Sequence, residues 1–328
     1  MLPVKAQPFA FIVGSPRSGT TLLGEMLDKH KDISQWYEPY FVWDRHFRDY
    51  PHDERTAHDA TPRVRRQIYN DFVTFKRAMG SKLVVDKSPR NSLRVPFIQR
   101  IFPHARFITM TRDGRDVTLS IHKEWIRRRQ ILKDAANETR SDHKRAYGVF
   151  HRWLRRQPSL RYKVRALWFE THGHLLNGSR HLNRLRWNGS VGWGPRFRNW
   201  EDVLKKSSLL QFSAYQWAKC VENIHSNWHA IPDQNRLIIR YEDLLKDGER
   251  VIMRILEFLT LGRHEGFFTS LPKLKRDNFN KWQKEFSKEQ ISEIHPIVAP
   301  TLMDLGYEDS PDWLKRGEGS TTSTSHDA

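Results

Sequence analysis

Residues 11–23 read FIVGSPRSGTTLL, and this stretch decides the fold. An apolar run over residues 9–13 leads into Gly14, and after four further residues come Gly19 and two threonines. The spacing predicts a strand, a glycine-rich turn and a helix N-terminus whose backbone N–H groups hold a phosphate. A P-loop has lysine directly after its second glycine, where this chain has Thr20, and the only cation within the loop is Arg17. We therefore expect a phosphate site that works without the P-loop lysine.

Three further segments predict strands, namely residues 81–86 (SKLVVD), 105–110 (ARFITM) and 236–240 (RLIIR). Each is short and apolar, and helical patterns lie between them. Short strands that alternate with helices indicate an α/β, P-loop-like three-layer fold, with a central, mostly parallel sheet and helices on both faces. In such folds the ligand binds at the carboxyl ends of the strands.

The composition favours one large domain and an acidic partner. The chain has 328 residues, 38% of them hydrophobic, and a formal net charge of +18. Such basicity is compatible with nucleic acid, an anionic membrane surface, a polyanionic sugar or a nucleotide. A single cysteine, Cys220, excludes an intramolecular disulfide and a zinc site built from several cysteines, and we expect it to be packed in the core. No apolar run is long enough for a signal peptide core or a membrane span, so we expect no transmembrane segment and a cytoplasmic location.

The chain is expected to form one domain over residues 1–316, with a basic insertion at about 123–200 and a disordered tail over 317–328. Residues 123–165 carry 14 Lys and Arg against 4 Asp and Glu, interleaved with aromatic residues that include Trp125. Cations attract an anionic ligand over a distance, and aromatic faces stack on rings. We expect this segment to capture an anionic acceptor, although a plain solvated helix face is the alternative.

A second phosphate site is predicted at the end of the strand over 105–110. Arg112 follows this strand, and Ser120 comes eight residues later in the helix that follows. A guanidinium and a hydroxyl together suit a phosphate monoester. Two phosphate sites at neighbouring strand ends indicate a nucleotide that is phosphorylated at two separate positions.

Glu38 is the leading candidate for a general base. It lies in SQWYEPYFVW, where aromatic and proline neighbours favour desolvation and a raised carboxyl pKa. His122 and Asp86 are rival bases. Lys87, close to a strand end, is placed to face the transferred group.

The combined motifs resemble the sulfotransferase family, which uses 3′-phosphoadenosine 5′-phosphosulfate (PAPS). PRSGTT at residues 16–21 is similar to the tyrosylprotein and bacterial carbohydrate or lipid branches. Three further segments resemble those of bacterial members: WGPRF at 193–197, RYEDLL at 240–245 and NKW at 280–282. Cytosolic members have a histidine just after the strand near 82–86, where this chain has DKSP, so Glu38 is preferred to His122 as the base.

The resemblance implies sulfuryl transfer from PAPS to an acceptor hydroxyl or amine, with 3′,5′-ADP as product and no metal. Arg17, Lys87 and Glu38 are implied to be catalytic. The implied cofactor-binding residues are Ser15, Pro16, Arg17, Ser18, Gly19, Thr20, Thr21, Arg112, Ser120, Lys281 and Trp282. The acceptor class stays open between carbohydrate, lipid and other anionic acceptors.

Two other functions compete with this interpretation. A nucleotide kinase or other P-loop NTPase would have a lysine at position 20 and an acid for magnesium, for which Asp86 is the candidate. A non-enzymatic binder of nucleic acid or of a polyanionic glycan would explain the charge but not the two phosphate motifs.

Overall fold

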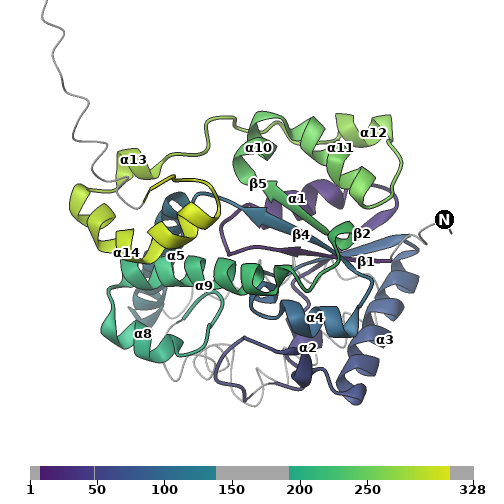
Figure 1. Cartoon of the computed structure of the whole chain (residues 1–328), viewed down its shortest axis with the longest axis horizontal. Coiled ribbons are helices and arrows are strands. Elements are labelled where there is room, and N and C mark those ends of the chain that lie inside the picture. The colour runs from purple at the N-terminus through teal and green to yellow at the C-terminus, as the bar shows by residue number, and fades with distance from the viewer. Residues whose placement is uncertain (1–7, 48, 138–191, 311–328) are drawn as a thin grey trace, which may run out of the picture.

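The computed structural model describes residues 8–47, 49–137 and 192–310 and contains a five-stranded parallel sheet (Figure 1). The strand order is β2-β3-β1-β4-β5, and every neighbouring pair is parallel. The strands are β1 (Phe9–Val13), β2 (Ile33–Tyr37), β3 (Leu83–Lys87), β4 (Arg106–Thr111) and β5 (Arg236–Arg240). The predicted α/β fold is confirmed.

Helices connect the strands and cover both faces of the sheet. The helices are α1 (Thr20–Leu27), α2 (Tyr40–Trp43), α3 (Pro62–Met79), α4 (Val95–Ile101), α5 (Gly114–Asn137), α8 (Trp200–Lys206), α9 (Leu209–Trp228), α10 (Tyr241–Lys246), α11 (Gly248–Phe258), α12 (Glu265–Thr269), α13 (Trp282–Glu285) and α14 (Lys288–Asp304). Short 3₁₀ turns occur at η1 (Ala57–Asp59), η2 (Pro89–Leu93) and η3 (Asp233–Asn235).

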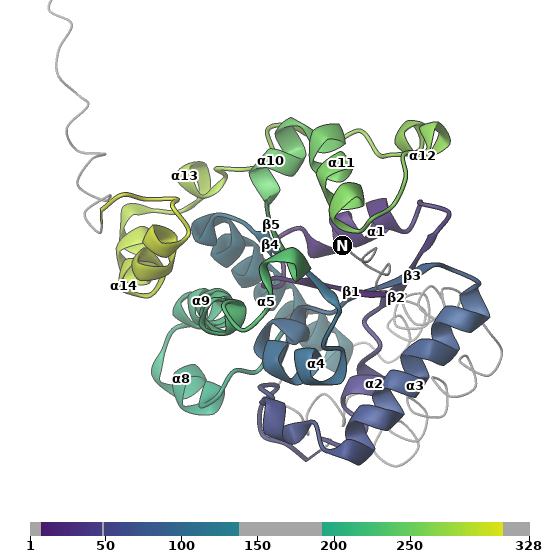
Figure 2. The same cartoon turned by 45° about the vertical axis from the view of Figure 1, so that its right-hand side comes forward.

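Strand β1 lies at the centre of the sheet and is buried on both faces. Phe9 and Phe11 point into one hydrophobic core, and Ala10 and Ile12 point into the other. In both views, α1, α10 and α11 lie on one side of the sheet and α3 and α4 on the other (Figures 1 and 2). An uninterrupted apolar strand is what a parallel sheet covered on both faces requires.

The register brings the carboxyl ends of the strands together. Ile12 of β1 is paired with Lys87 of β3 on one side and with Ile108 of β4 on the other. The loop after β1, the end of β3 and the turn after β4 therefore lie next to one another. Parallel strands thus place residues that are far apart in sequence around one site.

A third core forms where α5, α9 and α14 pack together. Trp125 of α5 is fully buried there, and its Nε1 donates to Oε1 of Gln216 at 2.8 Å. The expectation that Trp125 offers its ring to an acceptor is therefore wrong. Cys220 of α9 is buried in the same core, as expected.

The predicted insertion begins inside a helix of the core, because residues 123–137 continue α5. Its last residues also pack on the fold, since Phe197 and Trp200 are buried in the third core. Residues 138–191 and the tail 317–328 lie outside the described residues, so the insertion and the disordered tail stay predictions. Within the described ranges, none of the helices combines the length and the apolar character that crossing a membrane requires.

Candidate active site

A cavity of about 560 Å³ lies at the carboxyl ends of the strands. The wall is formed by residues of the loop after β1 and of α1, of the ends of β2 and β3, of η2 and of the turn after β4. Residues of α5, α10 and α13, and of the segments before α8 and α13, complete the described part of the wall. Together these residues are Pro16, Arg17, Gly19, Thr20, Thr21, Leu22, Tyr37, Glu38, Lys87, Pro89, Arg112, Asp116, Leu119, Ser120, Lys123, Glu124, Arg128, Trp193, Tyr241, Asn278, Lys281 and Glu285. The two predicted phosphate motifs and the candidate base thus share one cavity.

The loop after β1 presents the N-terminus of α1 to this cavity. Gly19 is the N-cap residue, and no side chain of the described residues caps the helix there. The first helical N–H groups thus lack a side-chain acceptor, and the helix dipole favours an anion at this end. The hydroxyl of Ser18 instead donates to the carbonyl oxygen of Ser15 at 2.6 Å, and Ser15 Oγ donates to the carbonyl of Pro16 at 3.2 Å. Those two serines therefore shape the loop from inside.

Gly19 permits a close contact between the loop and Tyr241. Its φ is 95°, and a Cβ at this position would lie 2.4 Å from Cδ2 of the Tyr241 ring. The ring of Tyr241 is itself held, because its hydroxyl accepts from Nδ2 of Asn278 at 2.8 Å. Only glycine fits here without a shift of the ring.

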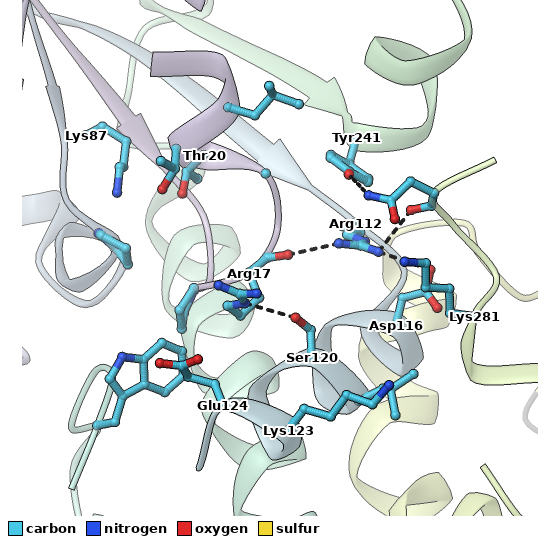
Figure 3. A pocket seen from close by; sticks show the side chains of 18 of the residues that line it. Arg17, Thr20, Lys87, Arg112, Asp116, Ser120, Lys123, Glu124, Tyr241 and Lys281 are labelled. Carbon is cyan, nitrogen blue, oxygen red and sulfur yellow. Dashed lines mark hydrogen bonds and ion pairs between the residues drawn. The ribbon is translucent and has the colours of Figure 1, made fainter. Parts of the chain in front are cut away.

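Arg112, in the turn after β4, and Ser120, in α5, reach the same loop (Figure 3). The Arg112 guanidinium lies 4.3 Å above the Tyr241 ring and donates to the carbonyl oxygens of Arg17 at 3.2 Å and Asn278 at 3.3 Å. Its Nε is buried and has no hydrogen-bond partner among the described residues. Ser120 Oγ accepts from Nε of Arg17 at 2.9 Å. The predicted pair therefore lies beside the phosphate loop, and Nε of Arg112 is a hydrogen-bond donor without an acceptor among the described residues.

Glu38 and Lys87 form an ion pair on the opposite side of the loop. Lys87 Nζ lies 2.6 Å from Oε1 of Glu38 and 4.3 Å from the centre of the Tyr37 ring. The Lys87 side chain is 1% exposed and the Glu38 side chain 24%. The sequence suggested a Glu38 carboxylate surrounded by aromatic and proline neighbours. In the structure, Lys87 instead holds this carboxylate at one oxygen. Oε2 of Glu38 has no hydrogen-bond partner within the described residues.

The backbone at Arg17 and Glu38 is left-handed, with φ of 70° and 47°. Such a conformation costs a residue with a side chain about 1–3 kcal/mol. At Glu38 two hydrogen bonds maintain it, because its N–H donates to the carbonyl of Lys87 at 3.3 Å and its carbonyl accepts from the N–H of Tyr40 at 2.7 Å. The fold thus gives up some stability to fix the directions of both side chains.

The charges around the cavity do not cancel. Six cationic and four anionic side chains line it. Each carboxylate is paired with a lysine or arginine: Glu38 with Lys87, Asp116 with Arg112, Glu124 with Arg128 and Glu285 with Lys123. Arg17 and Lys281 have no carboxylate partner in the described part of the chain. The surplus of two positive charges suits an anionic ligand.

Five predicted residues do not reach the cavity wall, namely Ser15, Ser18, Trp282, His122 and Asp86. Ser15 and Ser18 are buried within the loop. Trp282 packs against Arg115, whose guanidinium lies 4.2 Å from the ring, and only the neighbouring Lys281 lines the cavity. His122 lies on a different face of α5, where burial lowers its pKa. Asp86 is completely buried and accepts hydrogen bonds from Trp43, Ser88 and Asn91. The two rival bases are therefore away from the candidate site.

Burial raises the pKa of Asp86 to about 6, against the three donors that lower it. We expect Asp86→Ala to destabilise the fold by at least about 2 kcal/mol, because three buried donors would lose their acceptor. Chemical denaturation of both proteins measures this difference, with the exposed Asp233→Ala as a matched control. A stable Asp86→Ala protein that loses only magnesium-dependent nucleotide binding would instead assign Asp86 to a metal.

Sequence reasoning did not identify Tyr241, Asn278 or Trp193 as parts of the site. Tyr241 and Trp193 lie in the quoted segments RYEDLL and WGPRF. These segments were noted in the sequence, but it assigned no role to the two aromatic residues. Asn278 carries no local signal, and its contribution follows from its contact with Tyr241.

A group of metal-capable side chains, His30, Asp32 and His264, lies toward the opposite end of the strands, next to the start of β2. Nδ1 of His30 accepts from the Asp32 N–H at 3.2 Å, and its Nε2 lies 3.2 Å from the Gly262 carbonyl oxygen. Both ring nitrogens of His30 are therefore engaged within the protein.

Comparisons with known proteins agree with this geometry. Residues 8–165 match a family model described as the sulfotransferase family. Protein-tyrosine sulfotransferase 1 of Danio rerio is 33% identical over 121 residues, which are 34% of this chain and 34% of that protein. Nodulation protein NoeE of Sinorhizobium fredii is 27% identical over 130 residues, 35% of this chain and 31% of that protein. The matches thus cover about a third of the length of these curated relatives.

Among solved structures, the sulfotransferase domain from the curacin biosynthetic pathway has a similar fold. Its TM-score is 0.52 at 15% identity, and the alignment covers 92% of this chain and 98% of that chain. The similarity extends over both halves of the described fold, including the part that the family model does not reach. The match of residues 8–165 to the sulfotransferase family model agrees with the resemblance stated from the motifs.

Proposed function

We propose that this chain, whose residues 8–165 match the sulfotransferase family model, transfers a sulfuryl group from PAPS to an acceptor hydroxyl or amine. The observation that carries the proposal is the shared cavity. In it, the N-terminus of α1 and the cations Arg17 and Lys281 face the Glu38–Lys87 pair. The activity named for the protein-tyrosine sulfotransferase relatives supports the same reaction.

The residues present suit a nucleotide with phosphates at two positions. The first N–H groups of α1 and the hydroxyls of Thr20 and Thr21 would hold the 5′-phosphosulfate. Arg112, whose Nε has no partner among the described residues, and Ser120 would hold the 3′-phosphate. Lys281 adds a cation to the same wall.

Three residues, Glu38, Lys87 and Arg17, carry out the protein's part in the proposed reaction. When bound, PAPS supplies the sulfuryl group, and its phosphate oxygen takes the electron pair of the sulfur–oxygen bond that breaks. Glu38 accepts the proton of the acceptor at Oε2 as the acceptor oxygen or nitrogen bonds to sulfur. Lys87 keeps Glu38 in position through Oε1, and Lys87 and Arg17 stabilise the negative charge that forms on the departing phosphate.

A P-loop kinase fits the site less well. The lysine that would contact the β- and γ-phosphates is replaced by Thr20, and Asp86, the candidate magnesium ligand, is buried among its own donors. A nucleic-acid binder does not account for a cavity that encloses both phosphate motifs. The acceptor itself can be sought by incubating the protein with radiolabelled PAPS and carbohydrate, lipid, peptide and phenolic acceptors.

We expect 3′,5′-ADP to raise the melting temperature in the presence of EDTA, because the proposed contacts use backbone amides and cations. A ligand at 100 times its Kd adds about 2.7 kcal/mol to the free energy of unfolding. Thermal shifts with 3′,5′-ADP and with ATP, each with and without magnesium, test this. Greater stabilisation by ATP with magnesium would contradict the proposed donor.

Arg112→Ala should weaken 3′,5′-ADP binding by about 10–100-fold, since a charge-assisted hydrogen bond contributes about 1.5–3 kcal/mol. Calorimetric titration gives the Kd. Arg115→Ala is the matched control, because Arg115 is an equally buried cation of the same turn that pairs with Asp113 outside the cavity. Equal loss of affinity in both variants would point to a general disturbance of the fold and would remove Arg112 from the phosphate site.

A further inference from the structure

A second cavity of about 360 Å³ lies beside the first. The two cavities share five wall residues, namely Pro16, Glu38, Pro89, Arg128 and Trp193. Among the described residues, Tyr40, Arg90, Gly192, Gly194 and Pro195 line the second cavity alone. Glu38 therefore borders both spaces, and a molecule in the second cavity would meet the proposed base from the side away from Arg112.

The walls of this second cavity combine flat apolar surfaces with two arginines. Trp193 and prolines offer faces on which a ring can pack. Arg90 lies 3.7 Å above the Tyr40 ring and donates to Oδ2 of Asp44 at 2.7 Å, so it is held by a carboxylate outside the cavity, which it shares with Arg94. The other arginine, Arg128, is the cation that enters both cavities.

Arg128 is held in place from one side only. Its Nε donates to Oε1 of Glu124 at 2.6 Å, and its guanidinium carbon lies 5.4 Å from the centre of the Trp193 ring. The terminal nitrogens have no partner within the described residues, and the side chain is 40% exposed. An arginine fixed through Nε presents its two terminal NH₂ groups as a planar donor pair that matches a carboxylate or sulfate.

The neighbouring arginines of α5 are arranged differently. Arg127 uses both Nε and Nη2 on Glu124 and lines neither cavity. Arg129 lies with its guanidinium carbon 5.8 Å from the centre of the buried Trp125 ring. Of the three consecutive cations, only Arg128 faces the space next to Glu38.

We propose that Arg128 is a specificity-determining residue that binds an anionic group of a ring-containing acceptor in the second cavity. The ring packs against Trp193 and Pro89, and the nucleophile faces Glu38. This inference rests on the proposed sulfuryl transfer, and it assigns the preference for an anionic acceptor to one residue instead of to the whole basic segment.

The test uses two probes that differ in charge but hardly in shape, 4-hydroxyphenylacetate and 4-hydroxyphenylacetamide. Each is titrated into protein saturated with 3′,5′-ADP, and ligand-observed NMR gives the Kd. We expect the wild type to bind the carboxylate about tenfold more tightly than the amide, because a carboxylate accepts two charge-assisted hydrogen bonds from a guanidinium, whereas the neutral amide accepts through one oxygen. Arg128→Ala should abolish the preference, and Arg127→Ala should retain it.

The readouts separate this inference from the proposed function. If 3′,5′-ADP does not bind to the wild type, the proposed function fails. If 3′,5′-ADP binds but neither probe does, or if Arg128→Ala keeps the preference, the acceptor site at Arg128 is refuted while the donor site stands. An unchanged melting temperature and 3′,5′-ADP affinity in Arg128→Ala exclude a merely structural effect.

Discussion

Glu38→Gln should lower kcat by about 10²–10⁴-fold, the usual loss when a general base is removed. Glutamine keeps the size of the side chain, and its amide oxygen can still accept the hydrogen bond from Lys87 that Oε1 accepts in the wild type. It cannot take up the acceptor's proton. Affinity for 3′,5′-ADP should be unchanged, because Glu38 lies on the side of the loop away from Arg112. Initial rates with radiolabelled PAPS and the best acceptor from the screen give kcat.

A suitable control for this variant is Glu54→Gln. Glu54 is similarly exposed, at 21%, and is also paired with a cation, Arg198, but it lines neither cavity. Its kcat should equal that of the wild type. If Glu38→Gln retained activity within a few-fold of the wild type, the proton would have to leave by another route. His122 would not offer one from its observed position on another face of α5.

The sequence predicted the centre of the fold because its signals there are local. Strand β1 is apolar throughout, Gly14 and Gly19 mark the turn, and the helical pattern follows at once. Parallel pairing then brings the end of β4 to the end of β1, so Arg112 and Ser120 were correctly expected beside the loop. Knowledge of the sheet type was enough to infer this proximity.

Strand β2 was missed for a physical reason. Its sequence, ISQWY, contains two polar residues, Ser34 and Gln35, which are buried in the structure. Burial of Gln35 is made possible by contacts that its sequence does not reveal, since its N–H donates to Oδ1 of Asp28 at 2.7 Å and its side chain packs against Gly24. The position of Glu38 directly after a strand end therefore could not be predicted.

The finer parts of the site depend on contacts between distant segments. The Glu38–Lys87 pair requires β2 and β3 to be neighbours, and the spacing of residues along the chain does not supply that information. The separate roles of Arg127, Arg128 and Arg129 depend on the rotation of α5 relative to α9 and on the segment around Trp193. Composition could indicate a basic surface here. Only the packing of α5 shows which of the three arginines, Arg128, faces the cavities.

Gly19→Ala should weaken 3′,5′-ADP binding by at least about 100-fold, the largest effect that we expect on nucleotide affinity; in free energy this is about 2.7 kcal/mol. A methyl group at Gly19 would lie 2.4 Å from the Tyr241 ring. The ring cannot yield easily, because it is 5% exposed, bonded to Asn278 and covered by Arg112 at 4.3 Å. The collision therefore disturbs the helix N-terminus and the proposed 3′-phosphate site together. Calorimetric titration of both proteins measures the change.

Gly80→Ala separates this collision from the cost of the backbone conformation. Gly80 also has a positive φ, 65°, but a Cβ there would meet nothing within 4 Å. An alanine in the left-handed region costs about 1–2 kcal/mol at either position. Gly80→Ala should therefore lower the free energy of unfolding by that amount and leave the affinity for 3′,5′-ADP unchanged. Gly19→Ala should lower both the free energy of unfolding and the affinity for 3′,5′-ADP. If the two variants bound 3′,5′-ADP equally well, the contact between the loop and Tyr241 would not shape the phosphate site, and the nucleotide would have to bind elsewhere in the cavity.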